Sequence, residues 1–167
     1  MILENFGSWW KGKTSQNAKK LPDSEELIKQ SQLRVSTNIK NVEQVLEWFE
    51  QFNQPPLEGN AWWQSQTALV EGFTNAVRHA HKNLPSTTPI ELEVKLFAKH
   101  LEIRIWDCGQ PFDLQAKLNE ILQNPPVDPL EKEGGRGLIF MQKLTEEVGY
   151  SRGADERNCL VMKKKFD

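Results

Sequence analysis

The stretch Glu71-Gly-Phe-Thr-Asn-Ala-Val-Arg-His79 has the spacing of an amphipathic helix, and it decides how we interpret the rest of the chain. At about 100° per residue, one face of this helix is apolar and carries Leu69, Phe73, Ala76, Val77 and Ala80. The opposite face carries Glu71, Asn75, Arg78 and His79. Glu71 and Asn75 stand one turn apart, so both side chains can reach one small ligand. Because most amphipathic helices simply expose such a face to water, the functional interpretation needs support from other motifs.

Composition narrows the class of protein. The chain has 167 residues, which favours one domain with a core large enough to be stable alone. A net charge of −2 argues against a general nucleic-acid binder, which normally carries a basic excess. The sequence has neither an 18-residue apolar run nor a secretory signal, so we expect no membrane association. Cys108 and Cys159 form no disulfide framework or metal spacing, which favours a reducing cytoplasm.

The first part of the chain is polar and irregular, and we predict an N-terminal extension over residues 1–30 ahead of a folded domain over residues 31–167. The paired Trp9 and Trp10 suit a docking arm. Residues 7–14 also match the P-loop pattern G-x-x-x-x-G-K-[ST], in which Lys13 would neutralise phosphate. A working P-loop lies between a strand and a helix, and no βαβ pattern surrounds this one. A P-loop NTPase using Lys13 is therefore the weakest of the functional alternatives.

Hydrophobic periodicity then predicts the order of elements. Strands are expected at 33–39, 90–96, 101–105, 148–151 and 157–166, and helices at 42–52, 61–80, 114–122 and after Gly137. Ala98-Lys99-His100 is expected to join two strands as a hairpin loop with His100 exposed. Strict alternation leaves one face of each strand wet, which argues against a doubly wound parallel sheet. We therefore predict an α+β fold: a two-layer sandwich with a mixed, mostly antiparallel sheet and helices on one face.

Asp107-Cys108-Gly109 directly follows one of these strands. An ionised aspartate only accepts hydrogen bonds, so Asp107 can take one from the exocyclic amine of adenine. Gly109 has no Cβ and leaves room for a flat purine ring. The alternative is a plain Asp-x-Gly turn after a hairpin, which is common.

Gly134-Gly135-Arg136-Gly137-Leu138 directly precedes a predicted helix. Such a loop can bring backbone N–H groups and a helix N-terminus up to a polyphosphate, although a flexible connector has the same composition. The prolines and charges of 123–134 fit a mobile lid. Polyphosphate also needs Mg²⁺, to which Asn75 can offer one neutral oxygen. Glu71 can orient or deprotonate an attacking hydroxyl.

Taken in order, Glu71-x-x-x-Asn75-Ala-x-x-His79, Asp107-x-Gly109 and Gly134-Gly135-x-Gly137-Leu138 resemble the GHKL or Bergerat-fold ATPase superfamily, with its histidine-kinase-like ATPase fold. Within it, the match is closest to bacterial anti-sigma regulatory factors of the serine protein kinase type. The resemblance covers about residues 31–167. Where that family often carries a Gly-Thr pair before its last strand, this chain has Arg157-Asn158-Cys159.

The resemblance implies a role for each matched residue. Asn75 would hold Mg²⁺ against the phosphates of ATP, and Glu71 would be the catalytic base that activates a serine. Asp107 would bind the adenine amine, and Gly109 would line the adenine pocket. The phosphate-facing lid hinge would comprise Gly134, Gly135, Arg136, Gly137 and Leu138.

The implied activity is transfer of the ATP γ-phosphate to a serine of an anti-anti-sigma protein of the STAS type. A sigma factor would be the regulated partner, the location would be the cytoplasm, and a homodimer is one option. The alternative is a module that binds ATP or a partner without catalysis. Neither nucleic acid nor membrane is an expected partner.

Overall fold

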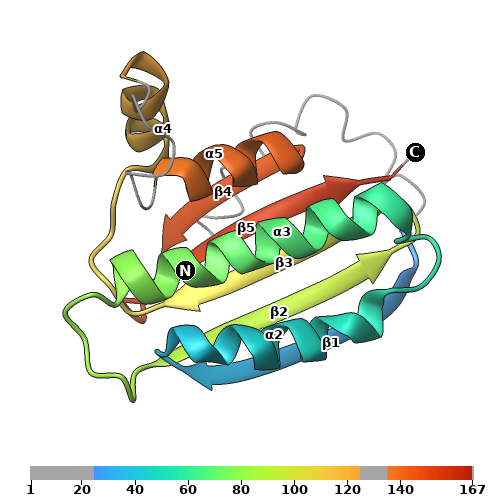
Figure 1. Cartoon of the computed structure of the whole chain (residues 1–167), viewed down its shortest axis with the longest axis horizontal. Coiled ribbons are helices and arrows are strands. Elements are labelled where there is room, and N and C mark those ends of the chain that lie inside the picture. The colour runs from blue at the N-terminus through green and yellow to red at the C-terminus, as the bar shows by residue number, and fades with distance from the viewer. Residues whose placement is uncertain (1–24, 125–134, 167) are drawn as a thin grey trace.

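The computed structural model of the protein describes residues 25–124 and 135–166 (Figure 1). This part of the chain contains five strands, of which β2 and β3, and then β4 and β5, follow each other directly. In chain order the elements are β1 (Leu27–Ser36), η2 (Ile39–Asn41), α2 (Val42–Phe49), η3 (Glu50–Phe52), α3 (Gly59–Asn75), η4 (Ala76–Ala80), β2 (Pro89–Phe97), β3 (His100–Asp107), α4 (Leu114–Gln123), α5 (Gly135–Leu144), β4 (Glu147–Arg152) and β5 (Asn158–Lys165).

The strands form one sheet in the order β1-β2-β3-β5-β4, and each of these four pairings is antiparallel. The last strand of the chain therefore lies inside the sheet, between β3 and β4. In this register Asp107, the last residue of β3, stands opposite Asn158, the first residue of β5. Two residues that are 51 positions apart are thus neighbours at one end of the sheet.

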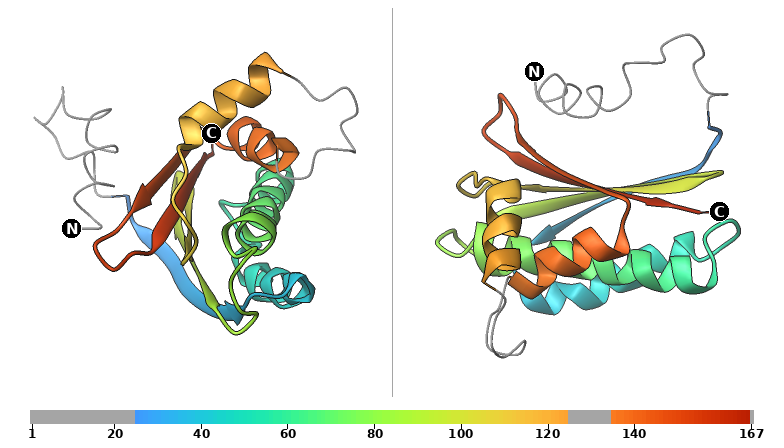
Figure 2. Two further views of the ribbon diagram at one scale, coloured as in Figure 1. Left: turned by 90° about the vertical axis from the view of Figure 1, so that its left-hand side faces the viewer. Right: turned by 90° about the horizontal axis from the view of Figure 1, so that it is seen from above.

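The helices α2, α3 and α5 form a second layer over one face of the sheet, as Figures 1 and 2 show. The core lies between the two layers. Its fully buried strand side chains include Met162 of β5 and those at alternate positions of β2 and β3: Ile90, Leu92, Val94, Leu96, Leu101, Ile103 and Ile105. From the helices, Phe49 stacks on Trp62 with ring centroids 4.6 Å apart, which joins α2 to α3. The α+β fold predicted from alternation is therefore confirmed, with the described sheet wholly antiparallel.

Gly72 sets the distance between α3 and the sheet. A Cβ at this position would stand 2.6 Å from Cδ1 of Ile105 and 3.2 Å from Cε of Met162. A Cβ here would therefore require these side-chain ends to shift, and a bulkier residue would require more. Helix propensity disfavours glycine here, so close packing is the reason for its presence.

The long helix predicted over 61–80 does not stay α-helical to its end. It changes at Ala76 into one π-helical turn, η4, in which His81 N–H donates to the Ala76 carbonyl at 2.9 Å. The wider turn shifts the phase of the following residues, so that His81 is buried and His79 lines a cavity. Single π turns of this kind are frequent at functional sites.

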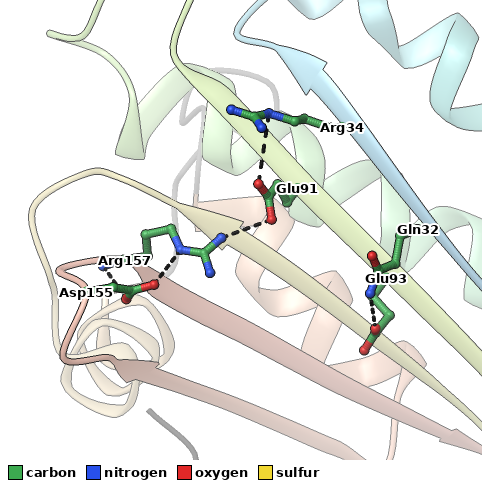
Figure 3. Close-up of polar contacts among 6 residues, drawn as sticks. All are labelled: Gln32, Arg34, Glu91, Glu93, Asp155 and Arg157. Atoms are coloured by element: carbon green, nitrogen blue, oxygen red, sulfur yellow. Dashed lines mark hydrogen bonds and ion pairs between the residues drawn. The ribbon is translucent and has the colours of Figure 1, made fainter. Parts of the chain in front are cut away.

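The other face of the sheet carries polar side chains (Figure 3) and a small buried apolar cluster of Cys159 and Val161 with Trp106 packed against it. Arg157 donates to Glu91 at 3.0 Å and to Asp155 at 2.7 Å, while Gln32 donates to Glu93 at 2.6 Å. Alternation predicts that Glu93 faces water, yet it is only 6% exposed. Burial alone would raise the pKa of Glu93, but the Gln32 hydrogen bond and the charge of Lys95 outweigh it and lower the pKa.

Two further details differ from the sequence-based predictions. His100 is not an exposed loop residue: it begins β3, is buried, contacts Glu25 and stacks on Phe97 with centroids 4.5 Å apart. The hairpin loop is shorter than predicted, so the histidine belongs to the strand.

The strand β1 runs from Leu27 to Ser36, whereas the predicted strand covers residues 33–39. Within the described residues, no helix is long and apolar enough to span a bilayer.

Candidate functional site

Two adjoining cavities lie where η4 and the carboxyl end of β3 meet. The larger has a volume of about 770 Å³ and lies among η4, α4 and the loop after β3. The smaller is about 10 Å³ and reaches inward between α3 and the sheet. Both are lined by Asn75, Phe112 and Leu138, so these side chains stand at the boundary between them.

Asp107 lines the smaller cavity and is 5% exposed. Its Oδ1 accepts hydrogen bonds from Gly109 N–H at 2.9 Å and from Asn158 Nδ2 at 2.8 Å. Both bonds use the same oxygen, so they fix the carboxylate while its Oδ2 carries neither of them. Asp107 thus provides an acceptor, held at a strand end, for a donor group that enters the pocket.

Asn158 is the residue that sequence reasoning missed. It is fully buried and its Nδ2 donates to Asp107 Oδ1 and also to the Gly109 carbonyl at 2.9 Å. Both ends of the Asp107–Gly109 turn are therefore tied to the first residue of β5. Its neighbour Arg157, held by Glu91 and Asp155 on the outer face, fixes the start of that strand (Figure 3). The signal in the sequence that could have indicated Asn158 was that Arg157-Asn158-Cys159 stands where the family often has a Gly-Thr pair.

Gly109 lines the larger cavity, but the structure gives another reason for a residue without a Cβ than room for a purine. A Cβ built there would stand 2.2 Å from the Ala80 carbonyl oxygen and 2.8 Å from the carbonyl carbon. The turn after β3 therefore packs backbone to backbone on the end of η4. This contact brings the motif at 107–109 to the polar end of the long helix.

His81 also stabilises the contact between the turn after β3 and the end of η4. Its Nε2 accepts the Cys108 N–H at 2.8 Å, and its Nδ1 lies 2.7 Å from Thr37 Oγ1. Because the Thr37 hydroxyl donates its proton to the Thr88 carbonyl, it accepts from His81 Nδ1–H. This assigns the neutral tautomer with the proton on Nδ1. Burial lowers the pKa of His81, although the charge of Asp107 acts in the opposite direction.

We predict that the protein loses stability in mild acid through this histidine. The unfolded chain takes up a proton as the pH falls through about 6.5, whereas the folded chain with its lowered pKa does not. Stability is therefore fully present above that pH and falls below it. We expect wild type to lose more unfolding free energy between about pH 7 and pH 5 than His81→Gln does, measured by urea denaturation.

The control for this experiment is the second buried histidine. Burial and then the charge of Lys163 lower the pKa of His100, so it adds a slope of the same sign. In His100→Gln, the part of the pH-dependent loss of unfolding free energy that is due to His81 should remain. An unchanged slope in His81→Gln would contradict the lowered pKa of His81.

The lining of the larger cavity includes two lysines and one glutamate, Glu120, besides the amide of Asn75. Lys82 and Lys117 both line it, together with His79. Lys117 also pairs with Glu120 one turn further along α4, at 3.8 Å. The larger cavity thus offers two cations, one of them paired, and the adjoining smaller cavity offers the buried acceptor Asp107. This combination suits an anionic ligand that also carries a donor group.

Glu71 lies outside the lining of both cavities. Its Oε2 is 2.8 Å from the position that a Cβ of Gly137 would occupy. Gly137 is in the first turn of α5, and a carboxylate near a helix N-terminus is electrostatically favourable. Glycine at 137 therefore lets the carboxylate one turn before Asn75 contact the start of α5.

The structure thus brings Asn75, Asp107, Gly109 and Leu138 around adjoining cavities, and it brings Glu71 against Gly137. Gly135 and Arg136 begin α5. Gly134, residues 125–134 of the lid predicted over 123–134, and the Gly7–Thr14 pattern with Lys13 fall outside the described residues. Among the described residues, no group of three or more His, Cys, Asp or Glu side chains forms a metal site.

Comparison with known proteins gives a consistent result. The model of the histidine kinase-like ATPase domain matches residues 35–164. Over 84 residues the chain is 40% identical to serine-protein kinase RsbW of Bacillus licheniformis. This matched segment covers 48% of this chain and 52% of that protein. Proteins of the same name from Oceanobacillus iheyensis and Staphylococcus epidermidis are 32% identical over 103 residues and 37% identical over 87 residues.

The matched part is shorter than these relatives. In the Oceanobacillus iheyensis protein it covers 60% of this chain and 63% of the relative, and in the Staphylococcus epidermidis protein 50% and 54%. The chain therefore spans between about half and two thirds of the length of the relatives it matches. All three relatives are named as serine-protein kinases.

Proposed function

The chain belongs to the histidine kinase-like ATPase domain family, and on that premise we propose that it is an ATP-dependent serine protein kinase that acts as an anti-sigma factor. It would transfer the γ-phosphate of ATP to a serine of an anti-anti-sigma protein of the STAS type in the cytoplasm. A sigma factor would be the partner that this phosphorylation regulates, with a homodimer as one option for the assembly. The observation that carries the proposal is the pair of adjoining cavities that share Asn75, Phe112 and Leu138, with Asp107 in the lining of the smaller one.

Each end of a nucleotide has a matching partner in this arrangement. Asp107 offers a fixed acceptor to the adenine amine at the inner end. Lys82 and Lys117 line the outer cavity, where the phosphates would lie. The larger cavity would therefore offer cations to the phosphates, and the smaller cavity would offer an acceptor to the adenine amine.

Mg²⁺ fits the residues present. This ion takes few protein ligands and keeps several waters when it is bound to a nucleotide. Asn75 lines both cavities and supplies one neutral oxygen, and the described residues contain no acidic cluster that would compete as a metal cage. When bound, the ion neutralises charge on the phosphates. Asn75 would hold and orient it, and Glu71 would take the proton from the serine hydroxyl.

A second candidate function is nucleotide binding without catalysis. It is favoured by one observation: the Glu71 carboxylate lies against Gly137, outside the lining of either cavity. A base needs hydrogen-bonding reach to the proton it removes, although such contacts often tighten only when substrate binds. Binding of ATP with no transfer to any anti-anti-sigma protein would support this alternative.

The test of nucleotide binding is a calorimetric titration of ATP with and without Mg²⁺. We expect wild type to bind more tightly with Mg²⁺ present. Asn75→Ala should lose most of that Mg²⁺-dependent gain and keep the affinity measured without the metal, because the base still contacts Asp107. Ser65→Ala, on the same helix and in neither cavity lining, is the control. Wild type that binds no ATP under either condition would refute the proposal.

A further inference from the structure

The hydroxyl of Tyr150 is buried close to Asp107. Tyr150 is on β4, opposite Leu160 of β5, and it lines the small inner cavity together with Asp107 and Gly72. Its Oη is inaccessible to solvent and has no hydrogen-bond partner among the described residues. Tyrosine hydroxyls in protein interiors usually find a partner, so this one requires an explanation.

The environment keeps this hydroxyl in its protonated form. Burial is the main effect that raises the pKa of Tyr150, and the negative charge of Asp107 raises it further. Oη is therefore a hydrogen-bond donor throughout the neutral range. The inner pocket offers an acceptor, the Asp107 carboxylate, and a donor, the phenol, in the same small space.

The edge of adenine that carries the amine has the complementary pattern. The exocyclic amine donates, and the ring nitrogens on either side of it, N1 and N7, accept. We propose that Tyr150 is a base-recognition residue whose Oη donates a hydrogen bond to N1 or N7 while Asp107 accepts from the amine. This inference rests on the proposed ATP binding and extends it to a residue outside the three motifs.

Access to this position requires Phe112 to move. The inner cavity of about 10 Å³ cannot hold a purine, and Phe112 stands at its boundary with the cavity of about 770 Å³. The rings of Phe112 and Tyr150 are in contact, with centroids 4.5 Å apart and planes tilted by 40°. The base would displace the Phe112 ring from Tyr150, and aromatic contact with the base would replace the contact that is lost.

The decisive variant is Tyr150→Phe, which keeps the ring and removes only Oη. In wild type we expect the Kd for ATP to be about three- to tenfold lower than in the variant, the range for one hydrogen bond. In the ligand-free protein the melting temperature should stay the same or rise, because the deleted hydroxyl has no partner. A purely structural role would instead lower the melting temperature.

A matched control stands next to it on the same strand. Ser151 also has a buried hydroxyl without a partner among the described residues, but it is not in the lining of either cavity. Ser151→Ala should therefore leave both the melting temperature and the Kd for ATP close to wild type. An equal loss of ATP affinity in both variants would overturn the proposal.

Two analogues identify the contacted nitrogen. One of the two analogues, 1-deaza-ATP or 7-deaza-ATP, should bind wild type about as weakly as ATP binds Tyr150→Phe. That analogue should lose no further affinity when it is titrated into Tyr150→Phe. If Tyr150→Phe binds ATP as wild type does, or if neither analogue shows this coupling, the proposal is overturned. Wild type that binds no ATP at all would be a failure of the proposed function instead.

Discussion

Replacing Glu71 with glutamine is expected to slow phosphate transfer to the serine of an anti-anti-sigma protein by about 100- to 10,000-fold, the usual contribution of a positioned general base. Glutamine has nearly the same shape, so its contact with Gly137 in the first turn of α5 is kept. It has no basic oxygen at neutral pH to take the proton of the attacking hydroxyl. Transfer of labelled γ-phosphate under single-turnover conditions measures the effect directly.

The affinity for ATP separates the role of Glu71 from a general disturbance of the site. Because Glu71 is absent from the lining of both cavities, Glu71→Gln should bind Mg²⁺ and ATP within about twofold of wild type. Weaker binding in proportion to the loss of transfer would assign Glu71 to nucleotide binding. Full transfer by Glu71→Gln would exclude it as the base.

A single methyl group at position 109 is expected to disrupt both the fold and the pocket. In Gly109→Ala the new Cβ meets the Ala80 carbonyl at 2.2 Å, and backbone on both sides prevents a cheap adjustment. We expect a loss of about 1–3 kcal/mol in unfolding free energy, typical of overpacking. The displaced turn also carries the hydrogen bonds from Gly109 N–H to Asp107 and from Asn158 to the Gly109 carbonyl. ATP affinity should therefore fall more than tenfold.

Gly72→Ala is the matched control for this substitution. Its Cβ would also meet a close atom, at 2.6 Å, but that atom is Cδ1 at the tip of the Ile105 side chain. The tip can move, and alanine is about 1 kcal/mol better than glycine inside a helix. We expect Gly72→Ala to stay within about 1 kcal/mol of wild type in urea denaturation. Equal losses in the two variants would show that close packing in general, rather than the backbone contact at Ala80, is responsible.

The pH prediction for His81 and the substitutions at 109 concern the same junction. His81 accepts the Cys108 N–H from one side, and Gly109 packs on Ala80 from the other. The π-helical turn η4 supplies both contacts, because its extra residue turns His81 inward after Asn75. The end of the long helix is thus built to hold the turn after β3 close to Asn75.

The sequence by itself determined the elements and the two-layer fold. Alternation in β2 and β3 and the helical spacing of Leu69 and Phe73 are local patterns, repeated every two or three to four residues. Their physical cause is burial of one face, which acts in the same way wherever the elements are placed. The three motifs around Asn75, Asp107 and Gly137 were also visible, because each needs only a few adjacent residues.

Only the tertiary structure decided what surrounds those motifs. Asn158 holds Asp107 because β5 inserts beside β3, and alternation does not specify which strands become neighbours. Gly109 is required by the Ala80 carbonyl, and Tyr150 reaches the inner pocket from β4. Such contacts join residues far apart in the chain and depend on strand order and on a π turn. The periodicity of any single segment does not encode them, since it records which face is buried and not what buries it.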